Sequence, residues 1–369
     1  MRTDISRRAL VAGAVALVPT LGLAACGGAT TTSPKGEQGS EDTGGNPLGL
    51  HSDSGKTLKV VCTNETYKKL FDKFTAEVGP AVEFVSMSSG EVLSKIKAEG
   101  GAPTADLWFG GGIDSFMSAK DQGLLEKVDF DAAADFATGF KDEGNHWFSK
   151  GLTIVGFIVN DDILAEKGMD KLSSWADLTD TSLKDEILMS TPAVSGTNYA
   201  AVNALLQNMG EDAGWRYLAA LNENIPYYTK RGSDPSTRVA AGEAAVGITY
   251  IDHTLDETLA SGSLELVYPS EGLPYMPDGV AAFAGADDLD DAKLFIEWLF
   301  SSDENLQTLV AIDQKSTILS VLPKTSGIEA DYSSEQLMRE DLSLFGSQRD
   351  DILAKWSEMT SGKEVRSDT

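Results

Sequence analysis

The chain has 369 residues, with 30 Lys and Arg against 57 Asp and Glu, which gives a formal net charge of −27. A balance this acidic excludes a surface built to collect the phosphates of nucleic acid or of anionic lipid. Because 41% of the residues are hydrophobic and 24% are charged, the composition is that of a globular protein, and the length predicts about two domains.

The N-terminal segment predicts export. Three arginines precede an apolar run over residues 9–25, and Cys26 follows this run directly. A charged start, an apolar middle and small residues at the cut are typical of a signal peptide. We therefore expect export by either the general secretory or the twin-arginine route and removal of residues 1–25. Leu23-Ala24-Ala25-Cys26 resembles the lipobox of bacterial lipoproteins. This resemblance implies a lipid on Cys26 that holds the protein at the outer face of the cytoplasmic membrane.

Residues 26–56 predict a flexible tether. They are mainly Gly, Thr, Ser and Pro with scattered charge, a composition that cannot offset the entropy of ordering. Once Cys26 is lipidated, Cys62 is the one remaining cysteine, so an intramolecular disulfide cannot form. Cys62 lies in an apolar run, which favours a buried and inert thiol.

The body begins with alternating strands and helices. The expected strands are 58–62, 82–86 and 106–109, and the expected helices are 67–78, 90–98 and 114–122. Each strand is a short apolar run, and each helix has apolar residues at a spacing of three or four. This alternation is typical of an α/β domain with a mainly parallel sheet.

A long β-like run at 151–160 predicts a crossing from the first lobe to a second. Beyond it we expect a helix at Trp175, strands 187–190, 246–250 and 280–284, two helices within 195–221, and helices from 252, over 289–300, over 304–312 and over 350–359. The resulting division assigns residues 57–150 and 280–335 to lobe 1, and residues 151–279 and 336–369 to lobe 2.

Five turns after strands carry small, hydroxyl or amide residues. Ligands of open α/β sheets bind beyond the carboxyl ends of the strands, and a helix N-terminus there favours an anion. A single such turn can equally be an ordinary N-cap, but five on one side of two sheets predict a ligand cleft. The candidate binding residues in these turns are Thr63, Asn64, Glu65, Ser88, Ser89, Gly111, Gly112, Ser195, Gly196, Thr197, Asn198, Arg231 and Ser233.

Asp252 and His253 follow the strand 246–250 and open a helix. A carboxylate beside an imidazole could bind a metal, catalyse, hold hydroxyls or simply cap the helix. The chain has three histidines, one of them in the tether, so a three-histidine zinc site in the body is excluded. We expect no metal and no cofactor. Tyr250 could stack on a ligand ring.

Two short motifs leave an exported hydrolase as a remote alternative. Ser94 and Lys97 match S-x-x-K, and residues 324–327 nearly match K-T-G, the pair found in serine acyl-enzymes. An S-D-N element between them is missing. The sequence therefore does not demand catalysis, and we expect a protein that is not an enzyme.

Several segments together resemble the substrate-binding proteins of ABC importers. They are 105–111, 123–125, 151–160, 191–197, 239–247, 269–272 and 278–281. The branch that they resemble contains ferric-ion, thiamine, hexose-phosphate and phosphonate binders. The resemblance implies an α/β, periplasmic-binding-protein-like fold in which two lobes of mixed, mainly parallel sheets are joined by crossover strands at a hinge.

The resemblance also implies a monomer that closes on a small ligand and delivers it to an ABC permease. Where ferric binders of this family have two tyrosines, this chain has Asp252 and His253, which disfavours iron. The anion turn at 195–198 is kept. We therefore predict a small organophosphate, a sugar phosphate or a phosphonate, with its phosphate on that turn and its polyol or amine end toward Asp252, His253 and Glu271.

The alternative ligands are thiamine or a thiamine phosphate, and ferric ion, which other proteins of the same family bind. A thiamine ring would need an aromatic sandwich. The candidates for it are Tyr227, Tyr228 and Tyr275.

Overall fold

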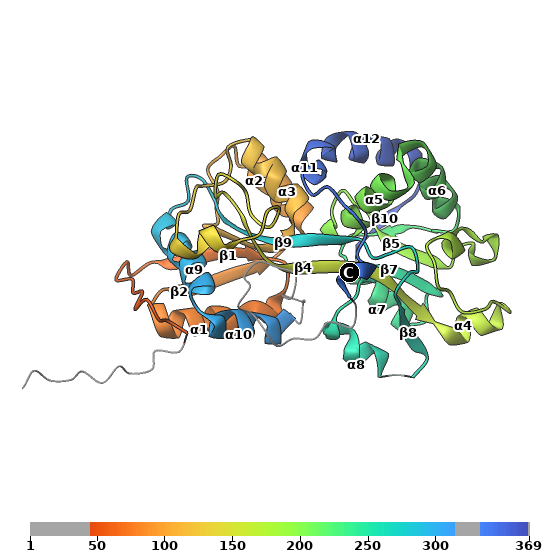
Figure 1. Cartoon of the computed structure of the whole chain (residues 1–369), viewed down its shortest axis with the longest axis horizontal. Coiled ribbons are helices and arrows are strands. Elements are labelled where there is room, and N and C mark those ends of the chain that lie inside the picture. The colour runs from red at the N-terminus through yellow and green to blue at the C-terminus, as the bar shows by residue number, and fades with distance from the viewer. Residues whose placement is uncertain (1–44, 261, 314–332, 368–369) are drawn as a thin grey trace, which may run out of the picture. The chain divides into compact units, whose positions relative to one another are not determined.

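The structure is a computed structural model, which describes residues 45–260, 262–313 and 333–367. The strands of this part form one ten-stranded mixed sheet in the order β10-β6-β5-β7-β4-β9-β3-β1-β2, with β8 paired to β4 (Figure 1). Their bounds are β1 (Thr57–Cys62), β2 (Ala81–Ser86), β3 (Leu107–Gly112), β4 (Phe148–Asn160), β5 (Ile187–Ser190), β6 (Tyr228–Thr229), β7 (Val246–Tyr250), β8 (Leu264–Val267), β9 (Tyr275–Ala282) and β10 (Val365–Arg366).

The first lobe is built on β1, which pairs in parallel with β2 and with β3. Side chains alternate along a strand, so Val61 of β1 faces one core while Val60 faces the other. Helices α2 (Ser89–Ala98) and α3 (Ile113–Asp121) cover the first face, and α1 (Lys68–Val78), α9 (Leu289–Ser301) and α10 (Asp303–Asp313) cover the second. The two-sided cover explains why β3 and most of β1 are apolar and buried, whereas β2, at the edge of the sheet, is only partly buried.

The second lobe repeats this plan around β5, which pairs in parallel with β6 and with β7. Helices α5 (Gly196–Met209) and α6 (Glu211–Glu223) pack on one face, and α7 (Asp234–Ala240) packs on the other. Shorter elements complete the lobe: α4 (Asp161–Glu166), α8 (Asp256–Leu259), α11 (Leu344–Ser347) and α12 (Arg349–Met359). The core on the α5 face is continuous with the core under α2 and α3 of the first lobe.

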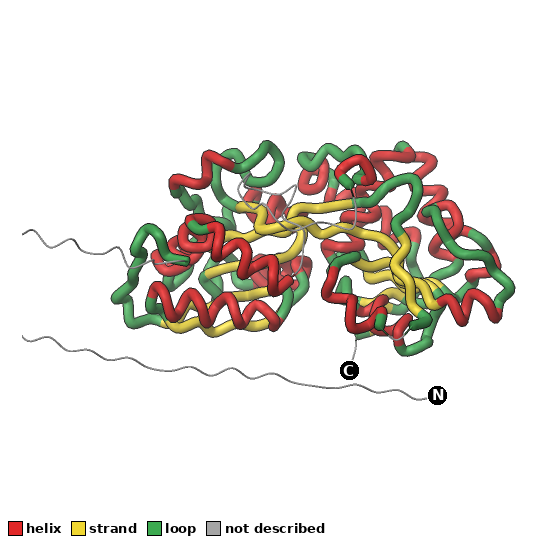
Figure 2. Tube along the Cα trace, turned by 60° about the horizontal axis from the view of Figure 1, so that its bottom comes forward, coloured by secondary structure: helices red, strands yellow, loops and turns green. Residues whose placement is uncertain are grey.

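Two strands connect the lobes. The first half of β4 pairs antiparallel with β9, and its second half pairs antiparallel with β7 and β8, so that β4 and β9 run from one lobe into the other (Figure 2). A buried ion pair adds a third connection, since Arg349 Nε of α12 lies 2.8 Å from Asp114 Oδ2 of α3. The predicted crossing and the predicted α/β fold of two lobes are confirmed.

The predicted elements differ from the observed ones at several points. The helix expected at Trp175 is a short 3-10 turn, η3 (Ala176–Thr179), and the strand expected at 280–284 begins earlier, at Tyr275. Burial of Cys62 is confirmed, and this burial raises the pKa of its thiol to about 11. Ser94 lies inside α2, where its hydroxyl donates to the carbonyl of Gly90 at 2.8 Å. The near K-T-G match at 324–327 lies outside the described residues.

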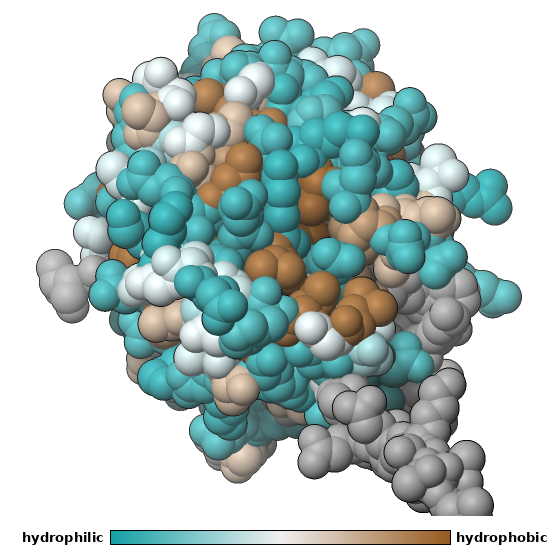
Figure 3. All heavy atoms as spheres, turned by 90° about the vertical axis from the view of Figure 1, so that its left-hand side faces the viewer, coloured by the Kyte–Doolittle hydropathy of each residue, from teal (hydrophilic) through white to brown (hydrophobic). Residues whose placement is uncertain are grey.

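The end of the first lobe presents a mostly hydrophilic surface, in which small groups of apolar side chains lie among polar ones (Figure 3). The exposed large hydrophobic side chains of the described residues are separate from one another in the sequence: Leu48, Val85 and Val365. Within the same residues, every helix is too short or too polar to cross a membrane.

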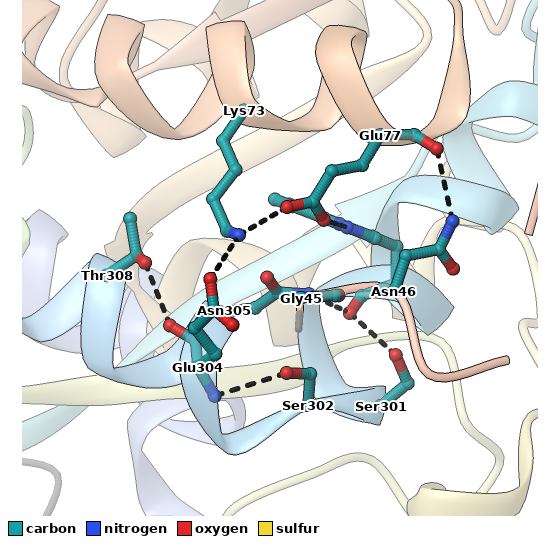
Figure 4. Close-up of polar contacts among 10 residues, drawn as sticks. Gly45, Asn46, Lys73, Glu77, Ser301, Ser302, Glu304, Asn305 and Thr308 are labelled. Carbon is teal, nitrogen blue, oxygen red and sulfur yellow. Dashed lines mark hydrogen bonds and ion pairs between the residues drawn. The ribbon is translucent and has the colours of Figure 1, made fainter. Parts of the chain in front are cut away.

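Residues 45–56, the end of the predicted tether, lie against the first lobe. Asn46 donates to the carbonyl oxygens of Leu50 at 2.8 Å and Glu77 at 3.1 Å, and Asn305 donates to the carbonyl of Gly45 at 2.5 Å (Figure 4). The buried side-chain amides of Asn46 and Asn305 thus provide hydrogen-bond donors for backbone carbonyl groups at this contact. Part of the segment predicted as a tether therefore contacts the first lobe, while residues 1–44, including Cys26, lie outside the described part.

Candidate functional site

A pocket lies where the strand ends of both lobes meet. Polar groups from the turns after β1, β3 and β7 and from the N-termini of α2 and α5 surround it. Its lining residues are Thr63, Asn64, Tyr67, Ser88, Ser89, Gly111, Gly112, Thr153, Ser195, Gly196, Thr197, Arg231, Gly232, Ser233, Tyr250, Asp252, Thr254 and Asp313. The five turns singled out in the sequence all contribute to this one pocket.

The second lobe presents the N-terminus of α5 to the pocket. Ser195 is the N-cap, and its hydroxyl accepts the N–H of Asn198 at 3.4 Å. Gly196 and Thr197, whose N–H groups belong to the first turn of the helix, line the pocket. The first-turn N–H groups of a helix have no partner within that helix and carry the positive end of its dipole. This wall of the pocket is suited to an anion.

Arg231 stands at the same wall, on the turn before α7. Its backbone N–H and that of Lys230 both donate to Asp234 Oδ2, at 2.7 and 3.1 Å, which holds the turn in place. The guanidinium lies 3.4 Å from Ser86 Oγ of the first lobe. Gly232 lets this turn approach the start of α5 closely, because a Cβ at this position would lie 2.6 Å from Thr197 Oγ1. A cation and a helix N-terminus therefore stand side by side.

The first lobe contributes two capped turns. Asn64 Oδ1 accepts the N–H of Thr66 at 2.9 Å and so starts the turn η1 (Glu65–Tyr67). At α2, the N–H of Ser88 donates to Glu91 Oε2 at 3.0 Å, which is half of a capping box. The N-capping reading of these turns is therefore correct, and it is compatible with their place in the pocket wall.

The floor of the pocket contains a buried ionic network that sequence reasoning missed. Lys150 Nζ of β4 lies 2.9 Å from Asp278 Oδ2 of β9 and 3.0 Å from Asp313 Oδ2 of α10, and it donates to Tyr67 Oη at 2.8 Å. Burial opposes the charge on Lys150, but the two carboxylates outweigh it and raise the pKa of its ammonium group. Asp278 also accepts the N–H of Gly111, which ties the floor to the pocket wall.

Asp252 lines the pocket and also caps the turn that follows β7. Its Oδ1 accepts the N–H of Thr254 at 2.9 Å, so the capping role weighed for this carboxylate is present beside the pocket. The side chain of His253 lies outside the described part of the structure. Among the described residues, three His, Cys, Asp or Glu side chains are nowhere grouped so that they could hold a metal ion.

Three predicted residues do not line the pocket. Glu65 is exposed on the turn after β1. Asn198 is completely buried behind the first turn of α5. Glu271 accepts the backbone N–H groups of Trp175 and Ala176, both at 3.1 Å; its assignment to the ligand is therefore corrected to the capping of η3, where the first N–H groups need an acceptor.

The tyrosines considered for a thiamine sandwich also lie outside the pocket lining. Tyr228 is buried against α12, with its hydroxyl 2.8 Å from Asn222 Oδ1, and Tyr227 bonds Glu243 at 3.1 Å. The lining residues that the sequence did not indicate are Tyr67, Thr153, Gly232, Thr254 and Asp313. Of these, Gly232 alone had a sequence signal, because it stands between two predicted residues.

Two lobes joined by crossing strands, with a polar pocket between them, define a solute-binding protein. Residues 69–334 match the family described as bacterial extracellular solute-binding protein, and the chain belongs to this family. Its members and structural neighbours are periplasmic substrate-binding proteins of ABC transporters.

Three individual proteins illustrate what the chain is similar to. An uncharacterized protein of Haemophilus influenzae is 32% identical over 308 residues, which are 81% of this chain and 89% of that protein. The solved structure of the periplasmic binding protein AfuA from Actinobacillus pleuropneumoniae, with fructose-6-phosphate bound, is 31% identical with a TM-score of 0.75, covering 84% of this chain and 100% of that chain. The phosphoglycerate transport regulatory protein PgtC of Salmonella typhimurium is 30% identical over 149 residues, 40% of this chain and 36% of that protein.

Ferric-ion-binding and thiamin-binding proteins of known structure share only the fold with this chain. Their sequence identity to it is 15% to 17%.

Proposed function

We propose that this protein captures a small organophosphate in the pocket between its lobes and delivers it to an ABC permease. The observation that carries the proposal is the pairing of the α5 N-terminus at Gly196 and Thr197 with the guanidinium of Arg231 in one pocket wall. First-turn N–H groups and an arginine together match the charge and the acceptor geometry of a phosphate.

Within this proposal the ligand has a defined orientation. The phosphate lies on the α5 wall of the second lobe. Hydroxyl groups of the ligand lie toward Asp252 and Thr254 and toward Tyr67 and Asp313 of the first lobe, which supply carboxylate and hydroxyl partners. A sugar phosphate offers more hydroxyls to these groups than a phosphonate does. AfuA, whose structure contains fructose-6-phosphate, supports this choice.

The alternatives receive less support from the pocket. A ferric ion prefers anionic oxygen ligands, and the described lining offers two carboxylates, Asp252 and Asp313. Thiamine needs stacked aromatic rings, whereas Tyr227, Tyr228 and Tyr275 lie outside the lining. A hydrolase of the S-x-x-K type needs a serine nucleophile inside a binding site, whereas Ser94 lies outside the pocket lining and its hydroxyl donates to the carbonyl of Gly90 within α2.

Export and anchoring complete the proposal. We propose that residues 1–25 are a signal peptide, that Cys26 carries the lipid, that residues up to 44 form the tether, and that the protein acts as a monomer at the outer face of the membrane. The support is the lipobox-like sequence and the membership in an extracellular family. The mass of the mature N-terminal peptide tests this part: an unmodified Cys26 contradicts it.

Titration calorimetry tests the ligand class. Fructose 6-phosphate, 3-phosphoglycerate and 2-aminoethylphosphonate are compared with fructose, which has no phosphate. We expect phosphorylated ligands to bind and fructose not to bind.

Thr197→Arg is expected to abolish this binding, because its side chain fills the anion turn. Thr308→Arg, on α10 and outside the pocket lining, is the matched control and should bind like the parent protein. The organophosphate proposal fails if none of the phosphorylated compounds binds, and the α5 wall is excluded as the anion site if Thr197→Arg keeps the parent affinity.

A further inference from the structure

The two lobes touch beside the pocket at the starts of two helices. Gly90, in the first turn of α2, donates its N–H to the carbonyl of Val194 at 3.2 Å. Val194 belongs to the turn before α5 in the second lobe, and Gly196 is the first residue of α5. The backbone of one lobe therefore contacts the backbone of the other.

Neither glycine leaves room for a side chain. A Cβ on Gly90 would lie 2.3 Å from the carbonyl oxygen of Ala193 and 2.9 Å from Val194 Cα. A Cβ on Gly196 would lie 2.9 Å from the nitrogen of Gly112 and 3.0 Å from Ser89 Oγ. Carbon and oxygen atoms that are not bonded stay about 3.3 Å apart or more. The atoms in the way are mostly backbone, so alanine at either position requires the lobes to move apart.

Backbone conformation does not explain these glycines. Gly90 and Gly196 are not among the glycines with positive φ, and both lie in helices. Alanine stabilises a helix more than glycine does, so a glycine in such a position has another reason. The close approach of the opposite lobe is that reason.

We propose that Gly90 and Gly196 form a closure seam, a pair of positioning residues that lets the lobes close over the ligand. This inference rests on the proposed function, because it assumes that the ligand binds in the pocket between the lobes. Ser89, Gly112 and Ser195 line the pocket and adjoin the seam, so parting the lobes here opens the pocket wall. The contact of Arg231 with Ser86 also crosses between the lobes.

The seam acts through the equilibrium between open and closed forms. A ligand that touches both lobes binds the closed form more tightly, and its apparent affinity falls with the fraction of protein able to close. A methyl group at the seam opposes closure but leaves both lobes intact.

Gly90→Ala is the decisive variant, because Gly90 does not line the pocket and the change cannot fill the ligand's space. Ser94→Thr is the matched control, since it also adds one methyl group to α2, on an exposed face, and keeps the hydroxyl. Small-angle scattering of the purified proteins without ligand gives the radius of gyration, and calorimetry with fructose 6-phosphate gives the affinity. Gly196→Ala serves as a second variant.

We expect Gly90→Ala to bind fructose 6-phosphate at least about tenfold more weakly than the parent. Its radius of gyration should be larger than that of the parent, because the added methyl group parts the lobes, and its unliganded melting temperature should not be lowered. Ser94→Thr should match the parent in both measurements. The seam is refuted if Gly90→Ala and Ser94→Thr agree in affinity and in scattering. If the parent binds none of the phosphorylated compounds, the proposed ligand class fails, and the scattering comparison alone then decides on the seam.

Discussion

At the scale of single residues, Asp288 shows how burial changes the pKa of a carboxyl group away from the pocket. It precedes α9 and is almost fully buried, next to Asp291 and Asp106, with Lys56 Nζ 3.8 Å from its Oδ1. Burial first, and then the neighbouring Asp291, raise the pKa of Asp288 to about 6. A carboxyl group whose pKa is raised in the folded state stabilises the protein below its unfolded pKa of 3.8, and this contribution is lost as the pH rises through about 6.

Asp288→Asn is therefore expected to raise the melting temperature at pH 7 and to change it little below pH 4, where the native side chain is already protonated. Asp290→Asn, on the exposed side of the same helix end, is the control and should show no such pH dependence. Melting curves from about pH 4 to pH 7, a range that includes the raised pKa of Asp288, measure the difference. A shift that is the same at both ends of this range contradicts the assignment.

Residue types explain which site residues could be predicted. Ser195, Thr197 and Arg231 stand in turns whose composition already favours an anion, and the structure places them in one pocket. The sequence gives no sign that Tyr67 lines the pocket, because an aromatic residue next to an apolar helix is expected in the hydrophobic core. Asp313 lies at the end of α10, and its approach to Lys150 depends on packing between segments far apart in the chain.

At the scale of elements, the crossing strands β4 and β9 are joined to α10 by the network around Lys150. Removing one partner of a buried ion pair leaves an uncompensated charge and costs about 3–5 kcal/mol. We expect Lys150→Met to lower the free energy of unfolding by about this amount, since Asp278 and Asp313 lose their common cation.

Urea unfolding measures this loss. Lys97→Met is the matched control, because Lys97 is exposed on α2 and its change should alter stability by less than about 0.5 kcal/mol. Equal stabilities of the two variants would mean that the network contributes nothing to the stability of the crossing.

The elements themselves were largely predictable, because the central strands and long helices carry apolar residues with a clear period. The strand β1 and the helix α1, for example, lie within a residue of their predicted bounds. The short strands β6, β8 and β10 span two to four residues, too few for a period to be read. Their pairing depends on the edge of an existing sheet, which is a tertiary property.

At the scale of the whole molecule, the net charge of −27 sets a constraint on anion binding. Repulsion among the carboxylates destabilises the folded form, and the same negative charge disfavours the binding of an anionic ligand. Salt screens charges more than about 8 Å apart at physiological ionic strength, whereas the contacts of a phosphate with Gly196, Thr197 and Arg231 act at closer range. The attraction of a phosphate to these nearby donors can therefore exceed its repulsion by distant carboxylates.

This balance predicts a salt dependence of stability. Raising sodium chloride from about 10 mM to about 150 mM shortens the Debye length from about 30 Å to about 8 Å, so the melting temperature of the unliganded protein should rise by a few degrees. Potassium chloride at the same ionic strength is the control and should give the same rise, because screening does not depend on the cation. A melting temperature that falls with salt would mean that attractive pairs, and not net repulsion, dominate the surface.

The sequence by itself determined the α/β alternation, the crossing strand and the turns that surround the pocket, because each of these depends on neighbouring residues and on local periodicity. It also carried the resemblance to solute-binding proteins. The tertiary structure alone decided that Lys150, Asp278 and Asp313 meet beneath the pocket and that Gly90 touches Val194. Such contacts join segments that are distant in the chain, so local sequence patterns do not predict them. A close approach of two backbones shows in the sequence only as a glycine, which has no side chain.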